Sequence, residues 1–539
     1  MDVDPLSRPR RGPRPLRAHL GLFVVLLVTL ALSAWGISWG LPSRDGWAGD
    51  EIVPRAVAAV AEHDFAGGWP TLKYPPLHYL LLGAVHAPVR AAAGPEVAPP
   101  ELNYRQMLAG RWLSIVMALG AVWAVYRAAR ETTGHRGAAL AALMVAVVPT
   151  FVYFAKTANP EMPMLFWLAL ALWLYLRVLR RHRWRDWLLL AVAAALAVGT
   201  KDQAYGFFVL APLALLPSLA AHRRAEGLPG GLRTLADRRL LLALLAGLLA
   251  FVLAWNLPAN RQGLRDHVRT LTGAGALAKE AREHPPTPAG HLANLAQNVR
   301  HLAFCLGGPL FAVCAAGAVA ALAAALRRRA PRDRLLAALL LLGLSYYLTF
   351  LAPILFSRDR YTLPLVLVLA PCGGALLARL LAAARGPARP LLAAALLAAF
   401  AWSASRAVSL DRRMTHDSRY AAEAWLAAHG VPPKTALAIG RPRHVPRIDR
   451  LDWRKLRRGA LRRRAPDYVV VNQTDLRTPF ERRVYQSLLE GTEGYRLARR
   501  FHWTSPWDTL DTKGALTTLD LVNPRLAVFA RVEKPFLFE

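Results

Sequence analysis

Long apolar runs separated by short clusters of arginine fill most of this chain, and they restrict the folds that it can adopt. Of the 539 residues, 55% are hydrophobic, and the mean hydropathy is +0.26. An apolar run of about 20 residues is long enough to cross the hydrocarbon core of a bilayer as a helix. Leucine and alanine blocks of this kind are not the profile of a soluble protein. The sequence therefore predicts a polytopic α-helical membrane protein.

The basic charge of the chain indicates membrane surfaces rather than nucleic acid as its surroundings. The formal net charge is +33, and many of the arginines lie in short connections between apolar runs. Arginine in such connections marks the cytoplasmic side of a membrane and contacts anionic lipid headgroups. The three cysteines, Cys305, Cys314 and Cys372, lie inside apolar runs, which favours packing thiols over disulfides or a metal site.

Charge bias and crossing parity together predict about 11 spans, with the N-terminus in the cytoplasm and the C-terminus outside. A basic segment, residues 1–18, precedes a membrane domain at residues 19–408, whose first outer loop is 41–105. The predicted spans are residues 19–40, 106–126, 137–153, 162–179, 187–200, 204–220, 240–256, 301–326, 335–355, 362–382 and 390–408. A cleaved signal peptide is the alternative for the first run, but this run is long for one. Residues 76–92 are interpreted as a helix in the outer interface, because counting them as a span reverses the charge bias of the later loops.

Residues 409–539 are more polar and predict a small α/β domain outside the membrane. Strand-like runs and one helical stretch support this interpretation. The strand-like runs are residues 435–439, 468–471 and 526–532, and the helical stretch is 418–429. The arginines between residues 441 and 464 fit either contact with anionic headgroups or a solvated basic face.

Ionisable residues gather at the outer ends of the predicted spans, where they are usually functional. Asp50 and Glu51 follow the first span, and Glu161 begins the fourth. Capping of a helix is the alternative role for Glu161. Basic residues also lie outside, against the usual bias: Lys73, Lys201, Arg358 and Arg360. Binding of phosphate fits these cations, and snorkelling at span ends is the alternative.

Five segments, in this order, resemble the GT-C membrane glycosyltransferases, and more narrowly the protein O-mannosyltransferase and aminoarabinose transferase branch. They are Gly49-Asp50-Glu51, Lys73-Tyr74-Pro75-Pro76-Leu77, Asn159-Pro160-Glu161, Gly199-Thr200-Lys201 and Arg358-Asp359-Arg360-Tyr361-Thr362-Leu363-Pro364. The resemblance covers roughly residues 19–400. It implies an inverting transfer of a sugar from a polyprenyl phosphate to an acceptor outside the cytoplasm, with no nucleotide cofactor.

The resemblance also implies roles for single residues. Asp50 is the expected general base, Glu51 orients it or helps it to hold a divalent cation, and Glu161 is a second catalytic acid. An inverting displacement needs a carboxylate to deprotonate the acceptor and cationic help for the departing phosphate. The expected donor-phosphate residues are Lys73, Lys201, Arg358, Arg360 and Tyr361. Tyr74 and Tyr361 fit equally an aromatic belt at the interface.

One departure from the family pattern bears on the metal. The aminoarabinose transferase branch carries an acid just before the lysine of its Lys-Pro-Pro-Leu segment, and here Leu72 occupies that place. A divalent cation held by Asp50 and Glu51 remains the candidate cofactor, because adjacent carboxylates repel each other unless a cation neutralises them.

These expectations define an enzyme of the bacterial inner membrane. Its expected partners are a polyprenyl-phosphate sugar, membrane lipids and an acceptor glycan, lipid or protein, with no nucleic acid. The alternative is a transporter or flippase for an anionic lipid or a lipid-linked sugar. A transporter is expected to carry charges near the middle of broken spans, whereas the charges here cluster at span ends on one side. The donor sugar and the acceptor class cannot be read from these residues.

Overall fold

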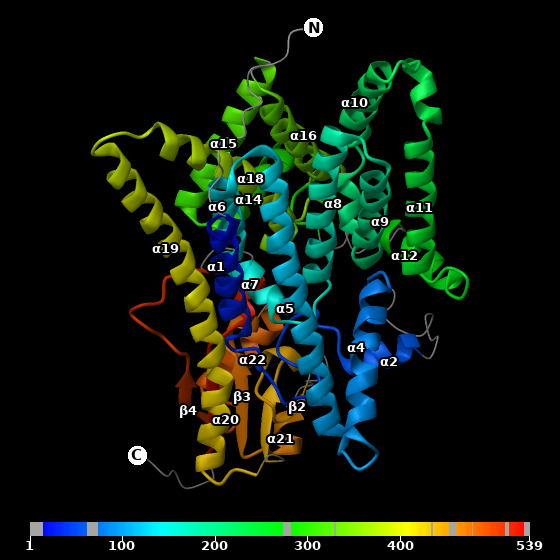
Figure 1. Ribbon diagram of the computed structural model, residues 1–539. Helices are drawn as coiled ribbons and strands as arrows, with labels where there is room; N and C mark the ends of the chain where they lie inside the picture. The colour runs from blue at the N-terminus through cyan, green and yellow to red at the C-terminus, as the bar shows by residue number, and fades with distance from the viewer. Residues whose placement is uncertain are drawn as a thin grey trace.

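A bundle of helices makes up most of the molecule, and a single sheet lies near the C-terminus (Figure 1). This computed structural model describes residues 15–61, 74–272, 282–327, 330–432, 435–451, 460–476, 478–512 and 517–532. The sheet lies at the end of the bundle opposite the connections α10–α11 and α15–α16. The longer helices are α1 (Pro15–Ala34), α5 (Pro99–Thr132), α8 (Glu161–Arg181), α9 (Trp184–Thr200), α10 (Pro212–Ala225), α11 (Arg238–Ala254), α14 (Pro288–Leu306), α15 (Gly308–Leu326), α16 (Pro331–Tyr346), α18 (Asp359–Ala383) and α19 (Ala388–Thr415).

The prediction of a multi-pass membrane protein is confirmed. Within the described residues, 6 helices are long and apolar enough to cross a membrane, or up to 7 with a bent pair, α6 (His135–Ala146) and α7 (Pro149–Ala155). Every predicted span overlaps a helix, but several of these helices are shorter than a typical span. α9 and α11 have 17 residues each and α10 has 14. Length and composition therefore support fewer spans than the number predicted.

Several predicted spans are divided between helical segments, and two of these divisions have a clear local cause. The run at 137–153 bends by 72° between α6 and α7, because Pro149 disfavours helical backbone at the residue before it. The run at 301–326 is divided at Gly307, whose φ of +76° lies in the left-handed region and ends α14. Residues 76–92, which are predicted to lie in the outer interface, form a helix, α4 (Leu77–Ala93), and their place relative to a membrane stays a prediction.

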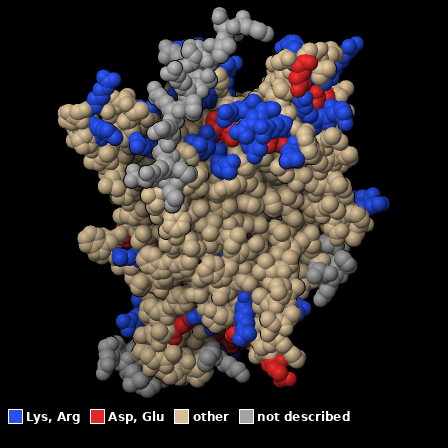
Figure 2. Space-filling view, viewed as in Figure 1, with Lys and Arg blue, Asp and Glu red and all other residues tan. Residues whose placement is uncertain are grey.

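On the face seen in Figure 2, charged side chains occupy the two ends of the molecule and are sparse between them. In Figure 2, lysine, arginine, aspartate and glutamate gather at the top and the bottom of the view, while the band between them is almost wholly uncharged. The top end carries the arginine-rich connections, and the bottom end carries the sheet. This distribution is the one expected of a protein that spans a bilayer.

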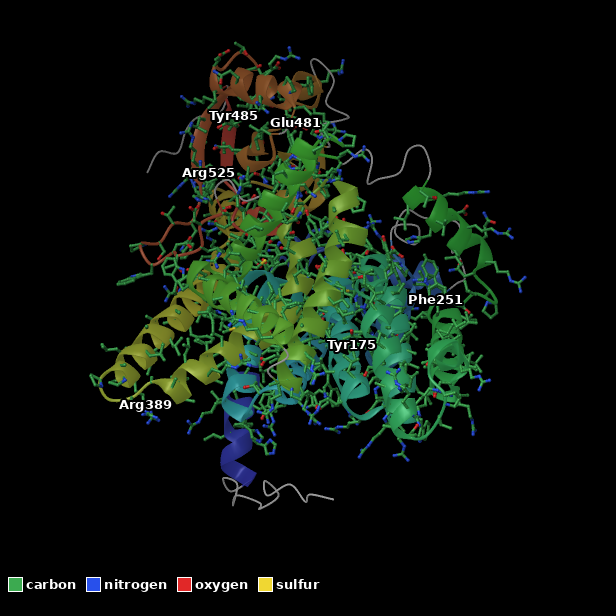
Figure 3. The ribbon with its side chains drawn as sticks, turned by 90° about the horizontal axis from the view of Figure 1, so that it is seen from above. Tyr175, Phe251, Arg389, Glu481, Tyr485 and Arg525 are labelled. Atoms are coloured by element: carbon green, nitrogen blue, oxygen red, sulfur yellow. The ribbon has the colours of Figure 1, made fainter. Side chains whose placement is uncertain are left out.

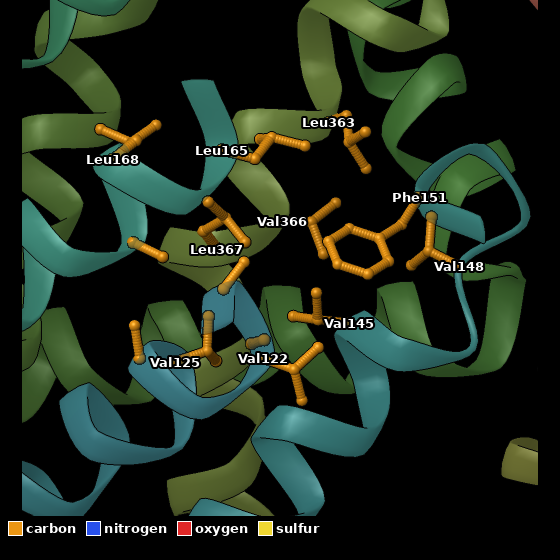
Figure 4. Packing of buried hydrophobic residues seen from close by; sticks show 14 of the residues in the cluster. Val122, Val125, Val145, Val148, Phe151, Leu165, Leu168, Leu363, Val366 and Leu367 are labelled. Atoms are coloured by element: carbon orange, nitrogen blue, oxygen red, sulfur yellow. The ribbon is translucent and has the colours of Figure 1, made fainter. Parts of the chain in front are cut away.

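The core of the bundle is built by α5, α6, α7, α8 and α18. Figure 4 shows Val122, Val145, Phe151, Leu165 and Val366 from these helices packed together. Glycines let α6 and α18 approach closely: a Cβ added at position 374 would lie 2.3 Å from the carbonyl oxygen of Gly137. Small residues at such crossings are typical of helix packing in membranes.

The sheet has the strand order β2-β1-β3-β5-β4. Its strands are β1 (Ala436–Ile439), β2 (Asp449–Leu451), β3 (Tyr468–Asn472), β4 (Tyr495–Phe501) and β5 (Leu526–Arg531). β1 is parallel to β2 and β3, and β5 is antiparallel to β3 and β4. The three predicted strands correspond to β1, β3 and β5, so the predicted α/β region is confirmed. Sequence reasoning missed β2 and β4.

Two helices complete the C-terminal part. α20 (Ser418–Ala428) matches the predicted helical stretch, and α22 (Pro479–Leu489) begins with a capping box formed by Thr478 and Glu481. In Figure 3, Glu481, Tyr485 and Arg525 group together, apart from Tyr175 of the bundle. The predicted domain boundary at residue 409 falls inside α19, which ends at Thr415. The division of the chain into domains stays a prediction.

Candidate active site

The loop after α1 is held against the start of α8. The side-chain nitrogen of Asn159 donates to the carbonyl oxygen of Gly49 at 2.7 Å, and the amide of Ile52 donates to the carbonyl of Ala158 at 3.1 Å. Asp50 between them has a φ of +60°, a region that a non-glycine residue rarely adopts. Such strain persists only where the surroundings impose it, and it is frequent at functional sites.

Glu51 is buried, and its carboxylate binds Arg111, whereas Asp50 binds Arg360. Its Oε1 accepts from Nε of Arg111 at 2.8 Å, and its Oε2 accepts from Nη2 of the same guanidinium at 2.8 Å. The amide of Ala158 also donates to Oε1, at 2.9 Å. Both side chains of the ion pair are fully shielded from solvent. Residues 35–53, between α1 and α2 (Pro54–Ala61), carry Asp50 and Glu51 and are called the acid loop below. Glu51 therefore anchors the acid loop to α5 and to the segment before α8.

Asp50 contacts Arg360, at the start of α18. Its Oδ2 accepts from Nη1 of Arg360 at 2.7 Å, and the same Nη1 lies 3.7 Å from Oε1 of Glu161. Asp50 keeps 27% of its side chain exposed, whereas Glu161 keeps 1%. One arginine thus joins two predicted acids, one accessible and one buried.

Lys201 completes this cluster. Its Nζ donates to Oε1 of Glu161 at 2.6 Å. Within the described chain, Oε2 of Glu161 and Nε of Arg360 are buried and have no hydrogen-bond partner. Buried polar atoms are nearly always hydrogen-bonded, so each of these two atoms keeps an unused capacity for a hydrogen bond.

Two tyrosines cover the lysine. The Nζ of Lys201 lies 5.7 Å from the ring centroid of Tyr74 and 5.6 Å from that of Tyr361, within the range of a cation–π contact. The hydroxyl of Tyr361 accepts from Nη2 of Arg360 at 3.2 Å. Burial raises the pKa of Tyr74 well above its usual value, and the charges of Asp50 and Glu161 add to this. Tyr74 is therefore neutral in the site.

Asp359 holds Arg360 in position, and sequence reasoning gave it no role. Its carboxylate accepts from the hydroxyls of Thr150 at 2.9 Å and Thr517 at 2.5 Å, and from the amide of Arg360 at 2.9 Å. These contacts join α7, α18 and the C-terminal part of the chain. Its place inside the arginine-rich motif was the only indication in the sequence.

The remaining predicted residues lie in different places. Arg358 forms an ion pair with Glu283 at 2.7 Å and lines a cavity that Asp50 and Arg360 also line. Lys73 lies outside the described residues.

A shared metal site on Asp50 and Glu51 does not fit this arrangement. Arg111 occupies both oxygens of Glu51, and Asp50 already pairs with Arg360. Within the described parts of the chain, no group of three or more histidine, cysteine, aspartate or glutamate residues is placed to hold a metal ion. Burial lowers the pKa of the nearby His78 to about 4, which keeps this side chain neutral.

Comparisons with known proteins agree with the motifs. Residues 101–255 match the family model described as "Dolichyl-phosphate-mannose-protein mannosyltransferase". In an alignment 211 residues long that covers 37% of this chain, the sequence is 29% identical to "Putative mannosyltransferase YkcB" of Bacillus subtilis (strain 168). The chain spans about a quarter (26%) of the length of that relative.

Two solved structures align with most of this chain. ArnT from Cupriavidus metallidurans, bound to undecaprenyl phosphate, aligns with a TM-score of 0.47 and 14% identity, over 97% of this chain and 100% of that one. The oligosaccharyltransferase AglB from Archaeoglobus fulgidus aligns with a TM-score of 0.46 and 11% identity, over 96% of this chain and 88% of that one. The family model confirms the predicted resemblance: this multi-pass membrane chain is similar to dolichyl-phosphate-mannose-protein mannosyltransferases over residues 101–255.

Proposed function

We propose that this protein transfers a sugar from a polyprenyl phosphate to a hydroxyl group of an acceptor outside the cytoplasm, with inversion at the anomeric carbon. One observation carries the proposal: Asp50, Glu161, Lys201 and Arg360 come from four separate segments and meet in one cluster of acids and bases. Asp50, the partly exposed acid of the cluster, lines a cavity. The family description, which names a lipid-phosphate mannose donor, supports the donor class.

In this reaction Asp50 acts as the general base. A lone pair of the acceptor oxygen forms a bond to the anomeric carbon, and Asp50 takes the hydroxyl proton. The bond between that carbon and the phosphate oxygen breaks, and its electron pair leaves with the polyprenyl phosphate. Asp50 suits this role because its side chain is accessible, whereas Glu51 and Glu161 are almost wholly buried.

Arg360 and Lys201 stabilise the departing phosphate. Both cations lie beside Glu161, whose negative charge holds them in place before the donor binds. A guanidinium matches two phosphate oxygens, and an ammonium supplies a point charge. Fixed cations aimed at a developing negative charge lower the barrier without reorganisation. The unpaired Nε of Arg360 is a donor available for this purpose.

Asp50 and Arg360 line a cavity together with residues that follow β1 and β3, so the cluster lies next to the C-terminal sheet. The sheet lies at the end of the bundle opposite the arginine-rich connections. Because arginine-rich connections favour the cytoplasmic side, this arrangement supports a site on the extracytoplasmic face of the bacterial inner membrane.

The test is a transfer assay with the full-length protein in lipid nanodiscs. The donor is undecaprenyl-phosphate mannose labelled in the sugar, and the products are free undecaprenyl phosphate and labelled acceptor. We expect both products in equal amounts, with the anomeric configuration of the product, read by nuclear magnetic resonance, opposite to that of the donor. Retention of configuration would exclude a single displacement with Asp50 as base. Movement of intact donor across the bilayer, without cleavage, would support a flippase instead.

A further inference from the structure

A cavity of about 610 Å³ lies where the acid loop meets the C-terminal sheet. Asp50 and Arg360 line one side of it, and residues that follow β1 and β3 line another. From β1 the chain continues to β2, which lies on one side of β1 in the sheet, and then to β3, which lies on the other side of β1. The carboxyl ends of β1 and β3 therefore form a topological switch point, which is where open α/β sheets bind ligands.

The wall supplied by the sheet is polar and held in place by its own contacts. Oδ2 of Asp475 lies 2.9 Å from Nδ1 of His444, and Oδ1 of Asp475 lies 3.5 Å from Nη1 of Arg441. The side-chain Nδ2 of Asn472 donates to the backbone carbonyl oxygen of His444 at 2.7 Å. Asn472, Asp475 and His444 are all buried. Polar groups fixed in this way are preorganised for a ligand, so little order is lost when one binds.

The lining of the cavity is balanced in charge and almost without apolar side chains. It includes three carboxylates and three guanidinium groups, and Leu521 is its only apolar side chain beyond glycine among the described residues. A phosphorylated acceptor would need an excess of cations, and a lipid tail or an apolar peptide side chain would need an apolar wall. Carboxylates, amides and guanidinium groups together match the donors and acceptors of sugar hydroxyls. The volume lies within the range of small-molecule sites.

We propose that this cavity binds the acceptor, and that the acceptor is an uncharged sugar unit whose hydroxyl is presented to Asp50. The proposal rests on the transfer function proposed above. It assigns Asp475 and Asp520 to acceptor binding: Asp475 from the end of β3, and Asp520 from the segment after residue 517. The donor then approaches from the side of Lys201 and the acceptor from the side of the sheet, so that Asp50 lies between them.

Binding is tested first, without the donor. The protein is held in nanodiscs, because sugar detergents would compete, and is titrated with the methyl glycosides of mannose, glucose, galactose and arabinose. We expect at least one glycoside to bind. Asp475→Asn and Asp520→Asn should each weaken its binding by about tenfold or more, the loss of one hydrogen bond to a charged group. Asp449→Asn, on the exposed start of β2, is the matched control and should bind like the unmodified protein.

Two substitutions keep the test decisive, since Asp475 is buried and its replacement can unfold the domain, whereas Asp520 is only partly buried. Absence of glycoside binding to the unmodified protein, or unchanged binding to both folded variants, would overturn the proposal.

Transfer is tested next, with the same glycosides, a peptide rich in serine and threonine, and a phosphorylated disaccharide lipid. We expect transfer to a glycoside, with the acceptor KM raised and the donor KM unchanged in both variants. Donor consumption with the peptide or the phosphorylated lipid, but with none of the glycosides, would refute the proposed acceptor class and leave the transfer function standing. Glycoside binding that is lost in the variants, together with no donor consumption under any condition, would refute the transfer function and keep the sugar site.

Discussion

Replacing Glu51 by glutamine should unfold the acid loop rather than remove a catalytic group. Both carboxylate oxygens of Glu51 accept hydrogen bonds from Arg111, and neither side chain of the pair is exposed. Breaking one partner of a buried ion pair typically costs about 3 to 5 kcal/mol, because the other charge stays buried. Arg111 also donates to the carbonyl oxygens of Ile37 at 2.6 Å and Trp39 at 2.8 Å, which keeps part of its charge solvated. We therefore expect a loss of about 3 kcal/mol in the free energy of unfolding.

The assay is denaturant unfolding of the purified protein in micelles, as a double-mutant cycle. Glu51→Gln, Arg111→Met and the double variant are compared, and the double variant should lose less than the sum of the single losses. Asp45→Asn is the control, because Asp45 lies in the same loop and pairs with the exposed Arg55. A Glu51→Gln protein of normal stability whose transfer is lost would refute the anchoring role and favour the predicted catalytic one.

Three further predictions follow from the site and the fold. Lys201→Gln and Arg360→Gln should each weaken donor binding by about 1.5 to 3 kcal/mol, measured by equilibrium titration, and unchanged affinity in both would favour snorkelling. Burial raises the pKa of Asp520 to about 6, so the native protein keeps this proton where the unfolded chain has lost it, and stability falls as pH rises from about 4 to about 6. Asp520→Asn should remove that loss, and its gain in melting temperature should grow through this window and stay constant above it. Reporter fusions after residue 160 should report the outside and fusions after residue 230 the cytoplasm; the reverse would invert the topology.

Much of the fold follows from hydropathy, because burial of apolar runs in a bilayer decides helix positions almost regardless of sequence detail. The break between α6 and α7 did not, since an average over a run does not register the single Pro149 that bends it. β4 was missed because its exposed positions carry Arg496, Arg499 and Arg500, which hide the alternation of a strand.

The site was predictable where chemistry and position coincide. Asp50, Glu161, Lys201 and Arg360 are ionisable residues at the outer ends of spans, and the structure brings all four together. The pairing of Glu51 with Arg111 was not predictable, since adjacent acids look alike in a sequence and only the fold decides which one points inward. The contribution of the sheet to the cavity depends on contacts between segments that are far apart in the chain, for which one sequence carries no information.

The most direct test of the central claim is the transfer rate of Asp50→Asn. Asparagine keeps the size of the side chain and one oxygen acceptor, but it cannot take the acceptor proton. The rate should fall by about a hundred- to ten-thousand-fold, the usual contribution of a general base. Donor affinity and melting temperature should stay close to those of Asp45→Asn, which should transfer normally. Near-normal transfer by a folded Asp50→Asn protein would contradict the account, because the reaction would then not depend on Asp50 as its base.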